Sequence, residues 1–169
     1  GVAMRILGID PGLRFTGWGV IDYQNHSPRH VANGTIATKA SQPMAARLAA
    51  IMQELQVLIQ NYQPDTSAVE ETFVNANPAS ALKLGQARGV AMTVPALHGI
   101  NVYEYAPNLI KKTVVGAGHA KKEQVQMMLK VLMPGVEFCS ADSADALAIA
   151  MCHAHHVPAK IRESGLERI

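Results

Sequence analysis

The spacing of apolar residues changes along the chain from the two-residue period of strands to the longer period of helices, and this change constrains the fold most. Before residue 40 the sequence predicts three short strands joined by turns, at 4–10, 15–22 and 31–37. Strands that follow one another through short turns form an antiparallel meander. From residue 44 to 59 the apolar side chains recur at helical spacing, which predicts an amphipathic helix.

The rest of the chain alternates between strand and helix. Strands are predicted at 67–70 and 100–105, and helices at 79–97, 121–132 and 141–155. This order predicts an α/β fold, with a mixed five-stranded sheet flanked by helices. No repeat or linker divides the chain, so its 169 residues are expected to form a single domain (1–169), with the tail after about residue 157 disordered.

Composition excludes several classes of protein. The 49% hydrophobic and 17% charged residues are typical of a globular chain with a core of its own. The two cysteines, Cys139 and Cys152, match no disulfide or zinc framework. No apolar run reaches the length of a membrane span, and no segment resembles a signal peptide. We therefore expect a cytoplasmic protein with no membrane partner.

The acidic side chains stand at the ends of the predicted elements. Asp10 ends the first strand before Pro-Gly, where a turn-forming aspartate is the simpler interpretation. Glu70 and Glu71 end the strand at 67–70, and alternation puts them on opposite faces, so at most one shares the side of Asp10. Asp142 and Asp145 lie three residues apart on one side of the last helix, where they also complement the helix dipole.

Carboxylates from two strand ends and one helix start can converge only if a cation offsets their repulsion. Magnesium prefers oxygen ligands, and two such ions can clamp a phosphodiester between an attacking water and a leaving oxygen. No serine or cysteine triad, phosphate-binding loop or zinc spacing competes with this interpretation. Three histidines, 153, 155 and 156, crowd the predicted end of the last helix, where we interpret them as partners of its C-terminus.

The basic residues are clustered although the net charge is only +2. Five lysines lie between residues 103 and 130 against only two glutamates, and the set is Lys111, Lys112, Lys121, Lys122 and Lys130. A solvated helix face is the simple interpretation of any one of them. As a group they could neutralise several phosphates of a nucleic acid.

Four blocks, in order along the chain, resemble the RuvC family of bacterial crossover-junction endonucleases. They are GIDPG with TGWGV at 8–20, Glu70 and Phe73 with SALKLGQARG at 80–89, TVVG at 113–116 with Lys121 and Lys122, and ADSADALAIA at 141–150. The resemblance implies a ribonuclease H-like fold and a homodimer that nicks four-way (Holliday) DNA junctions symmetrically in recombination and repair. It also implies magnesium, with Mn²⁺ able to substitute and two ions in each site, and work beside the RuvA-RuvB branch-migration complex.

The resemblance assigns roles to individual positions. It makes Asp10, Glu70, Asp142 and Asp145 the catalytic, metal-binding set and leaves Glu71 outside it. Phe73 matches an aromatic near the junction centre, with an ordinary core position as its alternative. Lys111 and Lys122 match basic positions that hold phosphate, and Lys112 and Lys121 of the lysine cluster complete the predicted DNA-binding set. A stripe of small residues, Ala81, Gly85 and Gly89, implies the dimer contact, although close packing on the sheet would also explain it.

Three other functions remain open from the residues alone. A sugar kinase or actin-type phosphotransferase shares the opening strand and glycine-rich hairpin, but it needs two comparable domains around a nucleotide. A nuclease for structured RNA would use the same carboxylates on the same bond. A non-catalytic binding module is disfavoured, because unneutralised carboxylates beside a basic groove would repel phosphate.

Overall fold

The computed structural model describes residues 3–71 and 77–166, with side chains described as far as residue 157. In chain order the elements are β1 (Met4–Asp10), β2 (Phe15–Gln24), β3 (Ser27–Ala37), α1 (Met44–Tyr62), β4 (Thr66–Glu70), α2 (Pro78–Leu97), β5 (Val102–Tyr105), α3 (Pro107–Val115), α4 (Lys122–Leu132) and α5 (Ala141–Leu166).

The strands form one mixed sheet with the order β3-β2-β1-β4-β5. The first three strands are antiparallel neighbours. Strand β4 then pairs with β1 in parallel, and β5 pairs with β4 in parallel. The predicted meander and the predicted five-stranded mixed sheet are confirmed. Because β1 and β4 are parallel and Ile9 lies opposite Val69, Asp10 and Glu70 end adjacent strands at the same edge.

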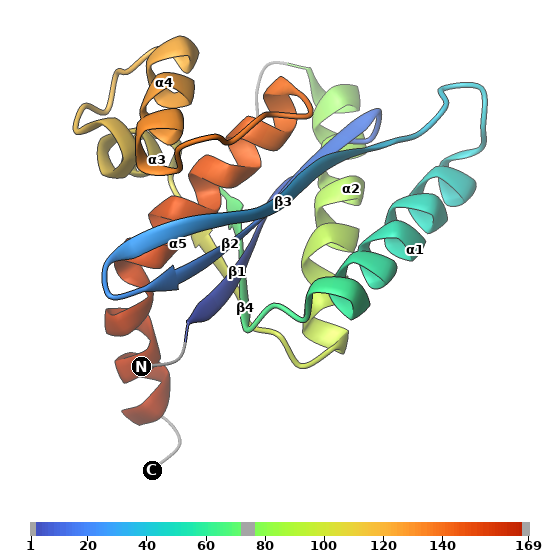
Figure 1. The fold of residues 1–169 in the computed structure, drawn as a ribbon. Coiled ribbons are helices and arrows are strands. Elements are labelled where there is room, and N and C mark those ends of the chain that lie inside the picture. The colour runs from blue at the N-terminus through green and yellow to red at the C-terminus, as the bar shows by residue number, and fades with distance from the viewer. Residues whose placement is uncertain (1–2, 72–76, 167–169) are drawn as a thin grey trace.

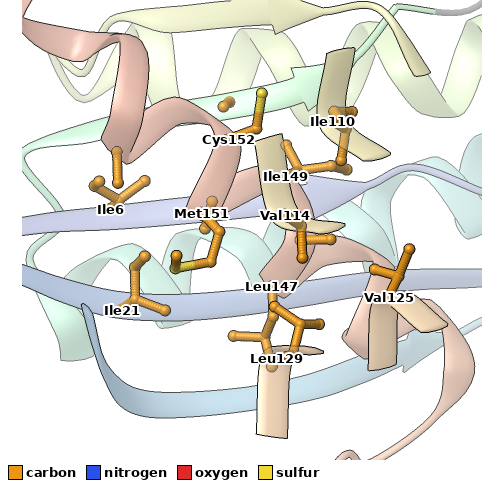
Figure 2. Close-up of a cluster of buried hydrophobic side chains, with 14 of the residues drawn as sticks. Ile6, Ile21, Ile110, Val114, Val125, Leu129, Leu147, Ile149, Met151 and Cys152 are labelled. Carbon is orange, nitrogen blue, oxygen red and sulfur yellow. The ribbon is translucent and has the colours of Figure 1, made fainter. Parts of the chain in front are cut away.

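Helices cover both faces of the sheet (Figure 1). The face covered by α1 and α2 holds one core, to which β1 contributes Leu7 and Ile9. The opposite face holds a second core beneath α3, α4 and α5, to which β1 contributes Ile6. In Figure 2 the labelled side chains of this second core come from β1 and β2 and from the helices α3, α4 and α5. Alternation therefore assigns Asp10 to the α5 face of the sheet.

Three glycines let α5 lie directly on the sheet. A Cβ on Gly8 would lie 2.1 Å from the carbonyl oxygen of Ala146, and a Cβ on Gly17 would lie 2.1 Å from that of Asp142. A Cβ on Gly19 would come within 2.6 Å of the Leu147 side chain. Any larger residue at Gly8 or Gly17 would push against helix backbone, so these glycines bring the first turns of α5 down to the end of β1.

Three elements differ from the sequence prediction. Strand β3 begins at Ser27, because Asn25 and His26 both adopt positive φ and close a two-residue turn. Helix α3 was not predicted, although Pro107 at its first position and left-handed Gly116 after its last turn are ordinary boundary signals. Helix α5 continues past the predicted end at residue 155 to Leu166, so the segment from 158 to 166, which we expected to be disordered, is helical.

Within residues 3–71 and 77–166, none of the helices is both long enough and apolar enough to cross a membrane.

Candidate active site

Three of the four predicted acids meet at the start of α5. Asp10, Asp142 and Asp145 each offer a carboxylate oxygen, and these oxygens lie within 4.8 Å of one another. All three side chains are half-buried. Asp10 is the last residue of β1, and it pairs with Gly17 on the adjacent strand β2. The backbone of Asp142 packs directly against Gly17. The close approach of helix to sheet thus assembles the cluster.

The first turn of α5 is held by serines on either side of Asp142. The hydroxyl of Ser140 accepts a hydrogen bond from the backbone N–H of Ser143 at 3.0 Å, and the hydroxyl of Ser143 accepts one from the N–H of Ser140 at 2.9 Å. Ser140 also exchanges a 2.6 Å hydrogen bond with the hydroxyl of Thr35 on β3. These contacts satisfy exposed N–H groups at the helix start and hold Asp142 in place.

Glu70 completes the acidic set from the adjacent strand. Ala68, two residues before it, belongs to the core under α5, so alternation puts Glu70 on the same face as Asp10. Glu70 lines one cleft together with the three aspartates. Glu71 lies beyond the end of β4, where its backbone N–H donates to the carbonyl of Tyr105. The arrangement agrees with the sequence argument that only one of the two glutamates joins Asp10.

Burial and the neighbouring charges raise the pKa of three of these carboxyl groups. Burial, then the negative charges of Asp145 and Asp142, raise the pKa of Asp10 to about 7. Burial and the charge of Asp145 raise the pKa of Glu70, while Lys111 and Lys122 oppose that rise. Burial also raises the pKa of Asp145 against the attraction of Lys122. The cluster therefore favours any species that brings positive charge among its oxygens.

Basic residues line the same cleft, which has a volume of about 650 Å³. Lys111 comes from α3, and Lys121 and Lys122 from the start of α4. The ammonium of Lys122 lies 3.4 Å from Asp145, and this contact raises the pKa of Lys122. Lys112 is exposed on α3 but does not line the cleft.

The residues of the predicted dimer contact lie apart from the cleft. Gly85 and Gly89 are exposed on α2, and a Cβ on either would meet nothing within 4 Å, so they do not pack on the sheet. Ala81 is half-buried in the first turns of the same helix. Phe73 lies outside the described residues.

One contact of the acidic strand was not foreseen from sequence. Arg88 of α2 donates a 3.3 Å hydrogen bond to the backbone carbonyl of Glu70 and forms an ion pair with Glu104 on β5. The arginine ties α2 to the end of β4. Its place within a helix gives no local signal for such a contact, because its partners lie 16 and 18 residues away in the chain.

The acidic cluster has the donors of a hard-cation site. Its ligands are carboxylate oxygens from rigid elements, without the histidine or thiolate groups that favour zinc or copper. Burial raises the pKa of Asp10, and so do the charges of Asp145 and Asp142, which Lys122 opposes. The residues present therefore fit magnesium or manganese.

Comparison with known proteins connects this site to a family. A sequence model described as "Crossover junction endodeoxyribonuclease RuvC" matches residues 6–153. A protein of that name from Agrobacterium fabrum is 56% identical over 153 residues, 90% of each chain. Another, from Rhodopseudomonas palustris, is 59% identical over 153 residues, 90% of this chain and 88% of that protein.

A solved structure extends the likeness to three dimensions. It is described as "T. thermophilus RuvC in complex with Holliday junction substrate", and it superposes with a TM-score of 0.84 at 31% identity over 91% of this chain and 94% of the other. The ribonuclease H-like fold implied by the sequence resemblance is thus confirmed.

Proposed function

Because the chain belongs to the RuvC family of crossover junction endodeoxyribonucleases, we propose that its acidic cleft hydrolyses phosphodiester bonds in four-way DNA junctions. The observation that supports this proposal is the position of Asp10, Asp142 and Asp145. Their carboxylate oxygens lie within 4.8 Å of one another in a cleft that Glu70 and lysines also line. The relative with a TM-score of 0.84, described in complex with a Holliday junction substrate, supports the choice of DNA.

The four acids would hold Mg²⁺, with Mn²⁺ as a substitute and two ions in each site. Bound magnesium supplies Lewis-acid chemistry, activating a water for attack and stabilising the leaving oxygen of the phosphodiester. The chain's own contribution is orientation, because each carboxylate projects from a strand end or a helix turn whose backbone is already hydrogen-bonded. Such preorganisation lowers the cost of bringing the reacting groups together.

The lysines of the cleft would hold the DNA strand. Lys111, Lys121 and Lys122 lie beside the acids, so they can neutralise the phosphates on either side of the one that reacts. Lys122 also pairs with Asp145, which reduces the repulsion between that carboxylate and an incoming phosphate. We extend the DNA-binding assignment to exposed Lys112, which would contact the strand further from the acids, and to Phe73 near the junction centre.

A homodimer would explain paired cuts. Two symmetric nicks need two identical sites related by a two-fold axis. The α2 face that carries Ala81, Gly85 and Gly89 supports a subunit contact there, because Gly85 and Gly89 leave room for another helix and neighbouring Leu82 is 65% exposed. We further propose that the dimer works with the RuvA-RuvB complex in the cytoplasm, where the chromosomal DNA lies.

Cleavage of a synthetic four-way junction tests this proposal. We expect paired nicks near the junction centre with Mg²⁺, none with chelator, and far weaker cutting of matched duplex or structured RNA. Binding without nicks in any metal would remove the nuclease assignment. Cuts confined to RNA would keep the phosphodiester chemistry and overturn the DNA substrate.

A further inference from the structure

An exposed aromatic side chain lies on the hairpin that follows Asp10. Phe15, the first residue of β2, is 44% exposed. It lies two residues before Gly17, whose missing Cβ would point at Asp142, so alternation directs Phe15 to the same face of the sheet as the acids. Two residues along a strand span about 7 Å, so the backbone of Phe15 lies about that far from Gly17.

The turn between β1 and β2 holds Phe15 rigidly relative to Asp10. The hydroxyl of Thr16, which is 1% exposed, donates to the carbonyl of Gly12 at 2.6 Å and accepts from the N–H of Gly12 at 3.2 Å. Gly12 packs so closely that a Cβ there would lie 2.2 Å from the Phe15 carbonyl oxygen. The backbone that carries the ring is therefore fixed by the turn. The ring itself is exposed and contributes little to the core.

Arg14 adds a positive charge beside the Phe15 ring. Its guanidinium carbon lies 5.2 Å from the centroid of the Phe15 ring, within the range of a cation–π contact. The lysines of the cleft come instead from α3 and α4. The hairpin thus carries an exposed ring and a positive charge of its own, separate from the lysines of the cleft.

We propose that Phe15 and Arg14 bind the DNA strand beside the scissile phosphate, with the Phe15 ring stacked on a neighbouring nucleobase and Arg14 on that nucleotide's phosphate. An exposed ring next to a guanidinium matches how proteins hold unpaired nucleic acid, by stacking combined with charge. Bases next to a junction cut are available for such stacking when the strand is unpaired or unstacked. The inference rests on the proposed function and adds a contact to it.

Phe15→Ala and Phe15→Trp separate the ring's role from its packing. In magnesium-free buffer with chelator, we expect Phe15→Ala to raise the Kd for a synthetic four-way junction about 5- to 20-fold, because one base–aromatic stack is lost. Phe15→Trp should stay within about twofold of the wild type. The matched control is Val57→Ala on α1, which removes another exposed apolar side chain (55% exposed) and should leave Kd unchanged.

A fluorescent base locates the contact. With 2-aminopurine on either side of the cut position, the wild type and Phe15→Trp should quench the probe at one of the two positions, and Phe15→Ala should not. Equal Kd and equal quenching in Phe15→Ala and the wild type would overturn the stacking contact. Thermal unfolding of each variant shows whether the hairpin is intact.

Arg14→Gln tests the second half of the contact. We expect the slope of log Kd against log salt to fall by about one, as for the loss of one phosphate contact. An unchanged slope would remove Arg14 from the site. If the wild type neither binds nor cuts the junction, the proposed function itself fails; if the wild type does both and the variants match it, this inference fails alone.

Discussion

Helix α5 carries polar side chains in two places, and the protein surrounds them in opposite ways. At its first turns, Asp142 and Asp145 face Asp10, so like charges meet at a half-buried site. About two turns further along, His153 is fully buried, with its Nε2 2.8 Å from the hydroxyl of Thr66 and its Nδ1 2.5 Å from that of Tyr105. Both ring nitrogens therefore have partners within the protein.

The difference separates a structural polar cluster from a functional one. The histidine group links α5 to β4, which ends at Glu70, and to the neighbouring strand β5. Burial raises the pKa of Tyr105, which keeps its hydroxyl protonated. The acidic group has raised pKa values at Asp10, Glu70 and Asp145. Polar groups that the fold satisfies serve stability, whereas carboxylates held together against their repulsion indicate a site for a cation from outside.

The largest expected effect is on catalysis at the acidic group. Asp10→Asn should lower the single-turnover cleavage rate of a four-way junction by at least about a thousandfold, because it removes one charge from the cation site. Junction affinity should persist or improve, since a negative charge beside the phosphate is lost. Glu54→Gln, an exposed acid on α1, is the control and should cut normally. Full activity in Asp10→Asn would contradict the assignment.

The next largest effect is on stability at the histidine group. His153→Leu should lower the free energy of unfolding by roughly 2–3 kcal/mol, because the buried hydroxyls of Thr66 and Tyr105 lose this partner. Urea unfolding measures the change, and exposed His119→Gln should show almost none. If the histidine group is only structural, folded His153→Leu should still cut a junction at low temperature at a rate within a few-fold of the wild type. A loss of cleavage as large as that of Asp10→Asn would contradict the distinction between the two groups.

The acidic group should oppose stability in metal-free protein at high pH. The pKa of Asp10 is about 7 in the fold against an ordinary 3.8, so the folded state binds the proton more tightly. Stability from this group is present below pH 4 and is lost as pH rises to 7. At pH 8, Asp10→Asn should therefore have a free energy of unfolding roughly 1–2 kcal/mol above that of the wild type, and should unfold at a higher temperature. At pH 4 the two proteins should be equally stable. Added Mg²⁺ should reduce the gap, and a variant less stable at pH 8 would reverse the sign.

The smallest effect concerns the lysine that touches the acidic group. Lys122 is 69% exposed, so Lys122→Gln should leave the unfolding temperature nearly unchanged. Its loss should weaken junction binding a few-fold and reduce the salt slope of log Kd by about one. Lys112→Gln is the matched variant, since that lysine does not line the cleft and should have less effect on cleavage. Identical cleavage defects would show that charge alone, and not position, matters.

The predicted strands and their faces needed only local pattern. Alternation within 67–70 correctly separated Glu70 from Glu71, because side chains of a strand point to opposite faces whatever the rest of the fold does. Helix α3 was missed although its proline and glycine boundaries are visible, because its lysines were read only as charge.

The histidines show where local pattern failed. His153 was interpreted as a partner of the helix C-terminus, but α5 continues to Leu166 and the ring is buried against Thr66 and Tyr105. Those partners are 87 and 48 residues away in the chain. Spacing within a helix carries no information about which strand its buried face will meet.

By itself, the sequence determined the order and type of most elements and the face of each strand, because these depend on neighbours within a few residues. That Asp10, Glu70, Asp142 and Asp145 form one catalytic set stays a prediction from the family resemblance. Only the tertiary structure decided that carboxylate oxygens of Asp10, Asp142 and Asp145 lie within 4.8 Å of one another, that Arg88 reaches the end of β4, and that the exposed Phe15 ring lies under Arg14. The first of these depends on the contact of α5 with glycines more than a hundred residues earlier, and the second on the packing of α2 against the sheet. Packing establishes such contacts, and local sequence does not encode them.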